Sequence, residues 1–450
     1  MNNRYFGTDG IRGLANYEPM TAETVLKLGK SLVHYLKTVK GSGCKNILIG
    51  KDTRLSGYMF EQAISAGIIS MGSNVQLLGP IPTPAISFLT TDMRADAGIV
   101  ISASHNPYQD NGIKFFDSKG LKFEEKSENI IENILIKKEY LQSNGDGIGK
   151  AFRIDDASGR YIVYLKNTFP KNYNLKGIKI VIDCSNGAAY KVSPLVLSEL
   201  GAEVITMSNK PDGKNINHNC GALHPENLQK RVVEEKADMG IALDGDADRV
   251  IFVDNRGNIV DGDKILALVI DDIVDRFGAR NSFVITEMSN ISLHRFIESK
   301  KADYYITQVG DKYVVNEMIK CKSRFGGEKS GHLIFMDYSN SGDGTLSAIQ
   351  LLAIILRKSK SLFELSHIID LYPQLLVNIK VKNKIPFGKI PKLNRLVKTS
   401  KKALGEEYRI NIRYSGTEML ARVMVEGEDE VKISNVARDI SNIIEKHIGI

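Results

Sequence analysis

Cysteine and long apolar runs are scarce in this sequence, and both absences narrow the class of protein. The 450 residues include four cysteines, none in a Cys-x-x-Cys spacing, which argues against a zinc site and a disulfide framework. Such cysteine usage suits a reducing compartment, so we expect a cytoplasmic protein. The amino-terminal sequence contains no apolar h-region, and we therefore expect no signal peptide. The longest nearly apolar stretch, residues 346–356, is interrupted by Ser347 and Gln350 and predicts a buried helix rather than a membrane span.

The sequence also lacks the common nucleotide-binding motifs. No Gly-Lys-Ser/Thr follows the amino-terminal glycines and no Gly-x-Gly-x-x-Gly follows an expected strand, so neither a P-loop nor a dinucleotide cofactor is indicated. The net charge of +7 is a mild basic excess, densest at residues 380–402. A nucleic-acid surface is one interpretation of that region, but no recognised nucleic-acid motif accompanies it, and a solvated surface is favoured. We expect no nucleic-acid or membrane partner, and the positive charge suits a small anionic substrate.

A pattern of strand, polar turn and helix occurs three times along the chain. Each copy is a short β-rich apolar run, a polar turn and a helix of about three turns, as in the layers of an α/β domain. The expected strands are residues 46–50, 179–183 and 282–286, and the expected helices are residues 58–71, 192–200 and 293–299. A chain of 450 residues is too long for one core, and several domains are expected.

Turn-rich stretches indicate where the domains divide. The glycine-rich loop at residues 143–150 precedes the second domain, the turn at residues 254–263 lies near the next junction, and residues 371–373 end the third helical run. The remaining residues follow a different order, strand-helix-strand-strand-helix. We therefore expect four domains, at residues 1–150, 151–254, 255–372 and 373–450.

Three aspartates at alternate positions carry the strongest chemical signal. Asp244, Asp246 and Asp248 follow an expected strand at residues 239–243, and alternate residues of an extended chain share one face. Three carboxylates on one face repel one another unless a cation neutralises them, and a hard cation such as Mg²⁺ prefers oxygen ligands. Three protein ligands leave coordination positions open, as a catalytic ion requires. A solvated acidic turn is the alternative, and Arg249 adds a fixed positive charge beside the group.

A Ser-Ala-Ser-His-Asn-Pro turn supplies the other half of a candidate phosphoryl-transfer site. It begins at Ser102, directly after an expected strand, and Pro107 disfavours an ordinary helix there. Such a turn can lift the hydroxyl of Ser102 or Ser104 into a cleft, although serine and asparagine also stabilise plain polar turns. A hydroxyl that carries a phosphoryl group needs a nearby divalent cation, so the serine turn and the three aspartates together predict one site.

Further polar residues are candidates for binding a sugar or a phosphate. Glu328 and Ser330, in a glycine-rich loop, could grip vicinal sugar hydroxyls, and His332 could act as a general base. A plain glycine loop between strands is the alternative. Lys114, at the start of a strand, could reach a phosphate or lie on the surface, and Arg12 stands among three glycines in a loop of the kind that contacts phosphate.

The Arg-Tyr-Ser-Gly-Thr-Glu sequence near the carboxyl terminus predicts an anion site between two strands. Arg413 supplies a guanidinium, while the N–H groups and hydroxyls of Ser415, Gly416 and Thr417 can form an anion nest. A plain β-turn is the alternative.

These five motifs occur in the order and approximate spacing of the α-D-phosphohexomutase family, which the chain resembles over essentially its full length. The resemblance implies an α/β fold of three similar α/β domains with mixed sheets and a smaller C-terminal α+β domain, around a central active-site cleft. The amino-terminal sequence Tyr-Phe-Gly-Thr-Asp-Gly-Ile-Arg-Gly resembles the bacterial branch that acts on glucosamine phosphates, rather than the phosphomannomutase/phosphoglucomutase branch.

The resemblance also implies a role for each candidate residue. Ser104 would be the phosphorylated serine. The ligands of one Mg²⁺ would be Ser104, Asp244, Asp246 and Asp248. The sugar ligands would be Glu328, Ser330 and His332, and the phosphate ligands would be Arg249, Arg413, Ser415, Gly416 and Thr417. The phosphoryl group in flight would be stabilised by Arg12, Lys114 and Arg249, and the general acid/base is open among Lys114, His105 and His332.

The implied reaction interconverts glucosamine 6-phosphate and glucosamine 1-phosphate, feeding UDP-N-acetylglucosamine and cell-envelope synthesis. Phospho-Ser104 would phosphorylate the sugar, and the glucosamine 1,6-bisphosphate would turn around before Ser104 recovers a phosphoryl group. That bisphosphate or a related one would also activate Ser104. The alternatives are a phosphomannomutase/phosphoglucomutase, a metal-dependent sugar phosphatase and a non-catalytic sugar-phosphate sensor. Met419 and Lys312 depart from the family, which usually has proline and arginine at these positions.

Overall fold

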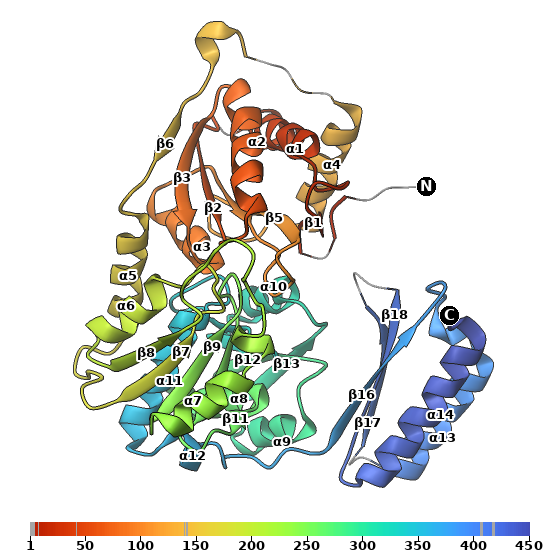
Figure 1. Cartoon of the computed structure of the whole chain (residues 1–450). Helices are drawn as coiled ribbons and strands as arrows, with labels where there is room; N and C mark the ends of the chain where they lie inside the picture. Colours follow the sequence, from red (N-terminus) through yellow and green to blue (C-terminus); the bar gives the residue numbers. More distant parts are fainter. Residues whose placement is uncertain are drawn as a thin grey trace.

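Four sheets organise the chain in the structure, a computed structural model. It describes residues 5–7, 9–41, 43–138, 140, 143–405, 408–415 and 419–450. Within these ranges the sheets have six, five, four and three strands in chain order. Figure 1 shows three domains packed on one another and a C-terminal domain standing beside them. None of the described helices combines the length and the apolar character that crossing a membrane requires.

The first domain is built on a mixed sheet of order β1-β5-β4-β2-β3-β6 with helices on both faces. In β2, Ile47 and Ile49 pack with α1 and α2, while Leu48 points to the opposite face, where α3 lies (Figure 1). A strand buried on both faces explains the uninterrupted apolar run in the sequence. The strands are β1 (Ile11–Leu14), β2 (Asn46–Lys51), β3 (Asn74–Pro80), β4 (Ala97–Ile101), β5 (Asp110–Asp117) and β6 (Ala151–Arg153), and the helices are α1 (Ala22–His34), α2 (Ser56–Ser70), α3 (Thr83–Asp92) and α4 (Glu125–Lys137).

The second domain has a mixed sheet of order β11-β10-β9-β7-β8, with β7 parallel to β8 and β9 and the other pairs antiparallel. Helix α5 lies between this domain and the first (Figure 1). The elements are α5 (Ala157–Thr168), β7 (Lys179–Asp183), α6 (Val192–Glu199), β8 (Glu203–Met207), α7 (Glu226–Glu234), β9 (Met239–Leu243), β10 (Val250–Asp254) and β11 (Ile259–Val260).

The third domain has a mixed sheet of order β13-β12-β14-β15. Its helix α11 contacts α5, β9 and β10 of the second domain as well as α8 and β15 of its own, and its residues 344–354 are all buried. The expectation of a buried helix here is confirmed. The elements are α8 (Gly262–Phe277), β12 (Ser282–Thr286), α9 (Ile291–Ser299), β13 (Asp303–Thr307), α10 (Asp311–Cys321), β14 (Phe325–Gly327), β15 (Leu333–Phe335), α11 (Gly344–Lys358) and α12 (Leu362–Leu365).

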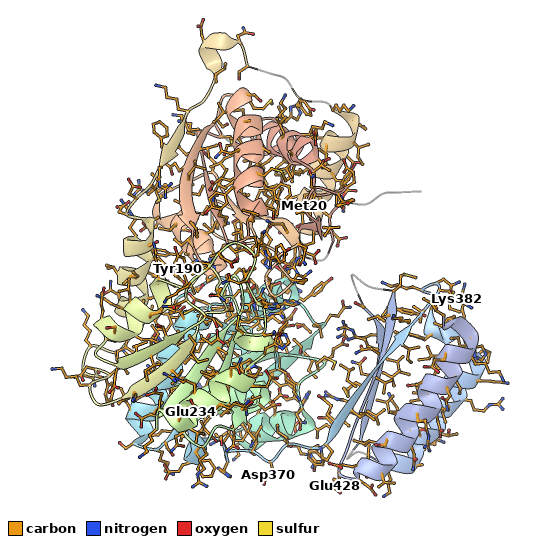
Figure 2. The ribbon with its side chains drawn as sticks, in the orientation of Figure 1. Met20, Tyr190, Glu234, Asp370, Lys382 and Glu428 are labelled. Atoms are coloured by element: carbon orange, nitrogen blue, oxygen red, sulfur yellow. The ribbon has the colours of Figure 1, made fainter. Side chains whose placement is uncertain are left out.

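The C-terminal domain is an antiparallel sheet of order β16-β18-β17 with two helices on one face (Figure 1). Asp370, labelled in Figure 2, lies near its link to the third domain, where its carbonyl accepts a hydrogen bond from the Ser292 hydroxyl. The expected strand-helix-strand-strand-helix order is confirmed. The elements are β16 (Gln374–Lys380), α13 (Pro391–Leu404), β17 (Arg409–Tyr414), β18 (Leu420–Glu426) and α14 (Glu430–Ile448).

Two of the expected domain divisions fall slightly inside a sheet. Strand β6 pairs with β3, so the first sheet extends past residue 150, and β11 pairs with β10, so the second extends past residue 254. Both strands are short and lie at a sheet edge, and each follows a turn-rich stretch that the sequence patterns indicated as the end of a domain. The division into residues 1–150, 151–254, 255–372 and 373–450 stays a prediction in its exact bounds.

Candidate active site

The serine turn joins β4 to β5 and brings Ser104 against the second domain. The Ser104 side chain is only 1% exposed, and its hydroxyl donates a hydrogen bond of 2.7 Å to Oδ2 of Asp244. Nδ1 of His105 lies 3.2 Å from the same hydroxyl oxygen. The φ of Ser104 is +52°, a left-handed conformation that serine seldom adopts. The turn therefore directs this hydroxyl at the aspartates through an uncommon backbone conformation.

Ser102 lies in the same turn but does not face the aspartates. Its hydroxyl donates a hydrogen bond of 2.6 Å to Oδ2 of Asp52 and accepts one of 2.9 Å from the backbone N–H of Ser104. Both hydrogen bonds stabilise the conformation of the turn. Of the two serines that the sequence offers, Ser104 is the one whose hydroxyl meets the carboxylate cluster.

Asp244, Asp246 and Asp248 form a buried carboxylate cluster in the turn between β9 and β10. One oxygen from each lies within 4.8 Å of the others. Burial, and then the charges of Asp248 and Asp246, raise the pKa of Asp244 well above its ordinary value. Within the described part of the chain, Oδ1 of Asp246 and Oδ1 of Asp248 are buried and accept no hydrogen bond. Three converging hard oxygen donors with unsatisfied capacity fit a divalent cation such as Mg²⁺.

Lys114 extends from β5 into this cluster. Its Nζ lies 3.1 Å from Oδ2 of Asp246 and 3.2 Å from Oδ2 of Asp9, and the side chain is 2% exposed. Burial lowers the pKa of Lys114, but the charges of Asp246 and Asp9 outweigh burial and raise it above its ordinary value. Arg12 forms an ion pair with Asp9 on the other side. Lys114 and Arg12 are therefore gathered beside the carboxylate cluster as cations, and the surface interpretation of Lys114 is wrong.

A second lysine connects the first domain to the third. Nζ of Lys122 lies 2.6 Å from Oδ1 of Asp9 and forms an ion pair with Asp311. His332 is buried 3.8 Å from both Oδ1 of Asp248 and Oδ2 of Asp311. Burial lowers the pKa of His332, but its interaction with Asp248, and then the charge of Asp311, raise it overall. His332 is thus held between two carboxylates.

Glu328 lies in the loop between β14 and β15. Its Oε1 accepts a hydrogen bond of 2.7 Å from the N–H of Gly310, and the Ser330 hydroxyl lies 3.5 Å from its Oε2. The φ of Gly310 is +136°, a backbone conformation that would be strained in any residue with a side chain, so glycine is needed to place this N–H. Lys312, two residues along, pairs with Glu128 of α4 at 3.0 Å. This departure from the family therefore joins two domains rather than pointing at Glu328.

Two residues of the first two domains line the cluster with opposite protonation behaviour. Burial, and then the charges of Arg249 and Arg12, lower the pKa of His105 to about 4, so its imidazole is neutral at pH 7. Burial lowers the pKa of Arg249, but Asp248 and Asp244 raise it, and the guanidinium stays charged. A neutral imidazole and a fixed cation suit proton transfer and anion binding respectively.

The C-terminal domain presents Arg413 at the end of β17. Nε of Arg413 lies 3.6 Å from Oε1 of Glu287 in the third domain, and Arg422 of β18 is its cross-strand neighbour. Burial, and then the charge of Arg422, lower the pKa of Arg413, while the charges of Glu287 and Glu328 act in the opposite direction. Arg413 and Glu328 are therefore within electrostatic reach of each other. Two guanidiniums on one sheet face make an anion-attracting surface.

The rest of the predicted anion nest is only partly described. The N–H of Ser415 donates a hydrogen bond of 2.9 Å to the carbonyl of Leu420, which closes the turn. Gly416 and Thr417 lie outside the described residues. Among the described residues, no hydrogen bond or ion pair joins Arg413 to the carboxylate cluster, in keeping with the separate position of this domain (Figure 2).

Sequence patterns did not identify several residues that complete the site. Thr83, the first residue of α3, donates a hydrogen bond of 2.7 Å to Oδ2 of Asp246. Asp9 stands inside a motif that was singled out for Arg12, and its acidic side chain between glycines was a usable signal. Lys122, Asp311 and Arg422 are isolated charged residues with no local motif, so only the packing of the domains reveals them.

Solved structures resemble this fold over its full length. A phosphoglucomutase/phosphomannomutase family protein from Burkholderia thailandensis superposes with a TM-score of 0.84 at 21% identity, covering 100% of both chains. An N-acetylphosphoglucosamine mutase from Aspergillus fumigatus, solved with GlcNAc-6P and magnesium, gives a TM-score of 0.71 at 16% identity over 98% of this chain and 95% of that one. At these identities the likeness concerns the fold.

Curated relatives are much more similar in sequence. A phosphoglucosamine mutase from Syntrophotalea carbinolica is 51% identical, covering 100% of this chain and 99% of the relative. A phosphoglucosamine mutase from Myxococcus xanthus is 50% identical, covering 100% of this chain and 98% of the relative.

Family models match nearly the whole chain, domain by domain. The models are those of phosphoglucomutase/phosphomannomutase α/β/α domains I, II and III and of the C-terminal domain, at residues 3–142, 159–257, 261–372 and 376–443. The serine turn, the aspartate turn, the Glu328 loop and Arg413 fall in the four domains in that order. The chain belongs to the phosphoglucomutase/phosphomannomutase family, the α-D-phosphohexomutases.

Proposed function

We propose that this chain catalyses the phosphoglucosamine mutase reaction, the interconversion of glucosamine 6-phosphate and glucosamine 1-phosphate, through phosphorylated Ser104. The observation that carries the proposal is the 2.7 Å hydrogen bond from the buried Ser104 hydroxyl to the three-carboxylate cluster. The choice of glucosamine is supported by the relatives at about 50% identity, which are named for that reaction. The enzyme is therefore an isomerase that works by intramolecular phosphoryl transfer.

Ser104 both gives and receives the phosphoryl group in this scheme. In the forward direction the bond between phosphorus and Oγ of Ser104 breaks, a bond to O1 of glucosamine 6-phosphate forms, and the proton of O1 passes to Oγ. The bound glucosamine 1,6-bisphosphate then turns around, the bond between phosphorus and O6 breaks, Oγ takes the phosphoryl group, and the proton of Oγ passes to O6. We assign the transfer of the proton at Oγ to His105. The assignment is supported by the 3.2 Å distance between Nδ1 of His105 and Oγ of Ser104 and by the neutral imidazole.

The carboxylate cluster would hold one Mg²⁺ together with the phosphoserine. The ion supplies positive charge that neutralises the oxygens of the phosphoryl group. The cations Lys114, Arg12 and Arg249 add fixed positive charge around the same position, and this electrostatic stabilisation needs no rearrangement during transfer. Glucosamine 1,6-bisphosphate, or a related sugar bisphosphate, would phosphorylate Ser104 and so activate the enzyme.

Sugar and phosphate recognition are assigned to the third and fourth domains. Glu328 and Ser330 would accept and donate hydrogen bonds to sugar hydroxyls, with His332 beside them. Arg413 and the Ser415 turn, with Gly416 and Thr417, would bind the phosphate that is not reacting. Because the sugar turns around while these groups stay in place, a single nest serves both ends of the bisphosphate.

The test removes the hydroxyl of Ser104, and a control variant removes the hydroxyl of a nearby exposed serine. Ser104→Ala should lose mutase activity and take up no phosphoryl group from glucose 1,6-bisphosphate, as measured by intact mass and peptide mapping. Ser118→Ala, an exposed residue of the turn after β5, should behave as wild type. Retained mutase activity in Ser104→Ala would overturn the proposal.

The same assay decides between the related reactions. Turnover of glucosamine 6-phosphate should exceed that of glucose and mannose 6-phosphates; the reverse order would assign a phosphomannomutase/phosphoglucomutase activity. Net release of inorganic phosphate would indicate a sugar phosphatase, and binding without turnover would indicate a sensor. A cytoplasmic location, a small hexosamine phosphate as substrate with no nucleic-acid or membrane partner, and a single ion per chain stay predictions.

A further inference from the structure

The backbone carbonyl of Ser104 receives hydrogen bonds from two different domains. A guanidinium nitrogen of Arg54, in the loop after β2, donates a bond of 2.8 Å to it. The side-chain amide of Asn217, in the second domain, donates another of 2.9 Å. Neither residue contacts the hydroxyl that carries the chemistry, and the reaction proposed above gives neither of them a role.

Arg54 holds the serine turn from inside the first domain. Its side chain is 0% exposed. Besides the Ser104 carbonyl it donates to the carbonyl of Asn106 at 2.8 Å, to that of Asp110 at 3.1 Å and to that of Pro107. Its Nε donates to Oδ2 of Asp52 at 2.8 Å, so the buried guanidinium is paired with a carboxylate. One side chain thus gathers the carbonyls of the whole turn.

Asn217 holds the same turn from the second domain. Its amide also donates a 3.0 Å bond to the carbonyl of Asn106, and its own backbone N–H donates 2.9 Å to the carbonyl of Ser185. Nearby, the Thr53 hydroxyl donates 2.5 Å to the carbonyl of Asn186, a further contact between the two domains. The turn is therefore fastened to the domain that carries the aspartates.

The left-handed backbone of Ser104 explains why such fastening is needed. A serine held at φ +52° is strained, and such a conformation persists only where its surroundings determine it from several sides. Rotation to an ordinary φ would carry Oγ away from Asp244 and would break the bonds to the carbonyl. The donors on that carbonyl and the direction of the hydroxyl are consequently coupled.

We propose that Arg54 and Asn217 are positioning residues that keep Ser104 in its left-handed conformation, so that the second domain aims the phosphorylated serine of the first domain at its own aspartates. The proposal rests on the function proposed above for the reaction itself. Asn217 is the more informative of the two, because it is half-buried whereas Arg54 is buried within the first domain and its loss would disturb folding.

The test is Asn217→Asp with Asn219→Asp as its matched control. Aspartate keeps the shape but replaces the amide NH2, which donates to both carbonyls, with one carboxylate oxygen that faces the carbonyls of Ser104 and Asn106. Asn219 lies in the same loop with a φ of +51° against +58° for Asn217, is exposed, and among the described residues its side chain makes no hydrogen bond. Both variants add one negative charge to the same loop, so the net charge is matched. Asn217→Gly removes the donors without straining a left-handed position.

The measurements separate the orientation of Ser104 from substrate binding, metal binding and folding. Asn217→Asp should lower kcat and the rate of Ser104 phosphorylation by glucose 1,6-bisphosphate about 100-fold, as expected for a misplacement of about 1 Å. The KM for glucosamine 6-phosphate, the Kd for Mg²⁺ and the melting temperature should stay near wild type. Asn217→Gly should lose about 10-fold, and Asn219→Asp should match wild type.

Three outcomes would count against one proposal or the other. Equal phosphorylation rates in Asn217→Asp and Asn219→Asp would overturn the positioning role. If Asn217→Asp is unstable, Asn217→Gly decides, and a wild-type rate in that variant would also overturn it. A wild-type protein that neither isomerises glucosamine 6-phosphate nor accepts a phosphoryl group on Ser104 would overturn the proposed function instead.

Discussion

Gly245 marks the closest approach of the serine turn and the aspartate turn, and alanine at this position measures how fixed that approach is. A Cβ there would lie 2.6 Å from the carbonyl oxygen of Ser104, 2.8 Å from Nδ2 of Asn217 and 3.0 Å from Cδ1 of Ile216. Non-bonded contacts prefer about 3.5 Å, so the two turns must separate by about 0.5–1 Å. We expect Gly245→Ala to lower kcat about 10- to 100-fold and to cost about 1–3 kcal/mol of unfolding free energy from overpacking.

The assay compares kcat, the rate of Ser104 phosphorylation by intact mass, and urea denaturation. Gly159→Ala is the control, because Gly159 lies on an exposed face of α5 and a Cβ there meets nothing within 4 Å. It should keep the wild-type kcat and gain up to about 1 kcal/mol from helix propensity. A Gly245→Ala variant with wild-type kcat and wild-type Ser104 phosphorylation would show that the two turns have no fixed register, and the geometric reasoning would be refuted.

Three further substitutions test the supporting structure. Burial, and then the charge of the neighbouring Asp261, raise the pKa of Asp263 from 3.8 to about 7. The stability contributed by this carboxyl is therefore complete below pH 3.8 and is lost as pH rises to 7. Asp263→Asn should abolish up to about 4 kcal/mol of this pH dependence in urea unfolding, and equal pH profiles for the variant and the wild type would contradict the prediction. Tyr161→Phe removes a buried 2.6 Å hydrogen bond to Asp343 and should cost about 1–3 kcal/mol without changing kcat, whereas an unchanged melting temperature would count against that bond. Lys122→Met removes the cation that joins Asp9 to Asp311 and leaves Asp9 paired with Lys114 and Arg12 within the first domain; it should cost about 3 kcal/mol and raise KM, and a variant as stable as wild type would refute the bridge.

Local patterns sufficed wherever the signal lies in consecutive residues. The strand at residues 282–286 was expected and found, because an apolar β-branched run bounded by polar turns has few other uses. The sequence predicted the aspartate cluster by assuming an extended chain, on which residues two apart share a face, but residues 244–249 form a turn in which Ala247 has a φ of +58°. Those carboxylates do converge within 4.8 Å.

The choice between Ser102 and Ser104 needed the third dimension. Both hydroxyls lie in the same turn, and turn chemistry permits either to face a cleft. The structure directs Ser102 to Asp52 and Ser104 to Asp244, and the partner of each hydroxyl comes from a segment distant in sequence. Resemblance to a family indicated Ser104, but the residues alone did not.

Single charged residues were the most frequent omissions. Arg54 and Lys122 carry no motif, and their effect depends on what lies opposite them after the domains pack. From the sequence, an arginine in the loop after a strand looks like an ordinary surface residue, and only the structure shows the carbonyls of a distant turn around Arg54. The role of such a charged residue is therefore set by the groups that pack against it, which the local sequence does not show.

By itself the sequence predicted the kinds of chemistry available: a hydroxyl on a turn, three alternating carboxylates, a candidate sugar-binding loop and a candidate anion nest. It could do so because each motif is set by backbone periodicity and turn geometry over a few residues. Only the tertiary structure decided which hydroxyl meets the carboxylates, which cations surround them and which donors hold Ser104 in its left-handed conformation. Those relations join segments from 50 to 140 residues apart, and the longer ones depend on how separately folded sheets pack together.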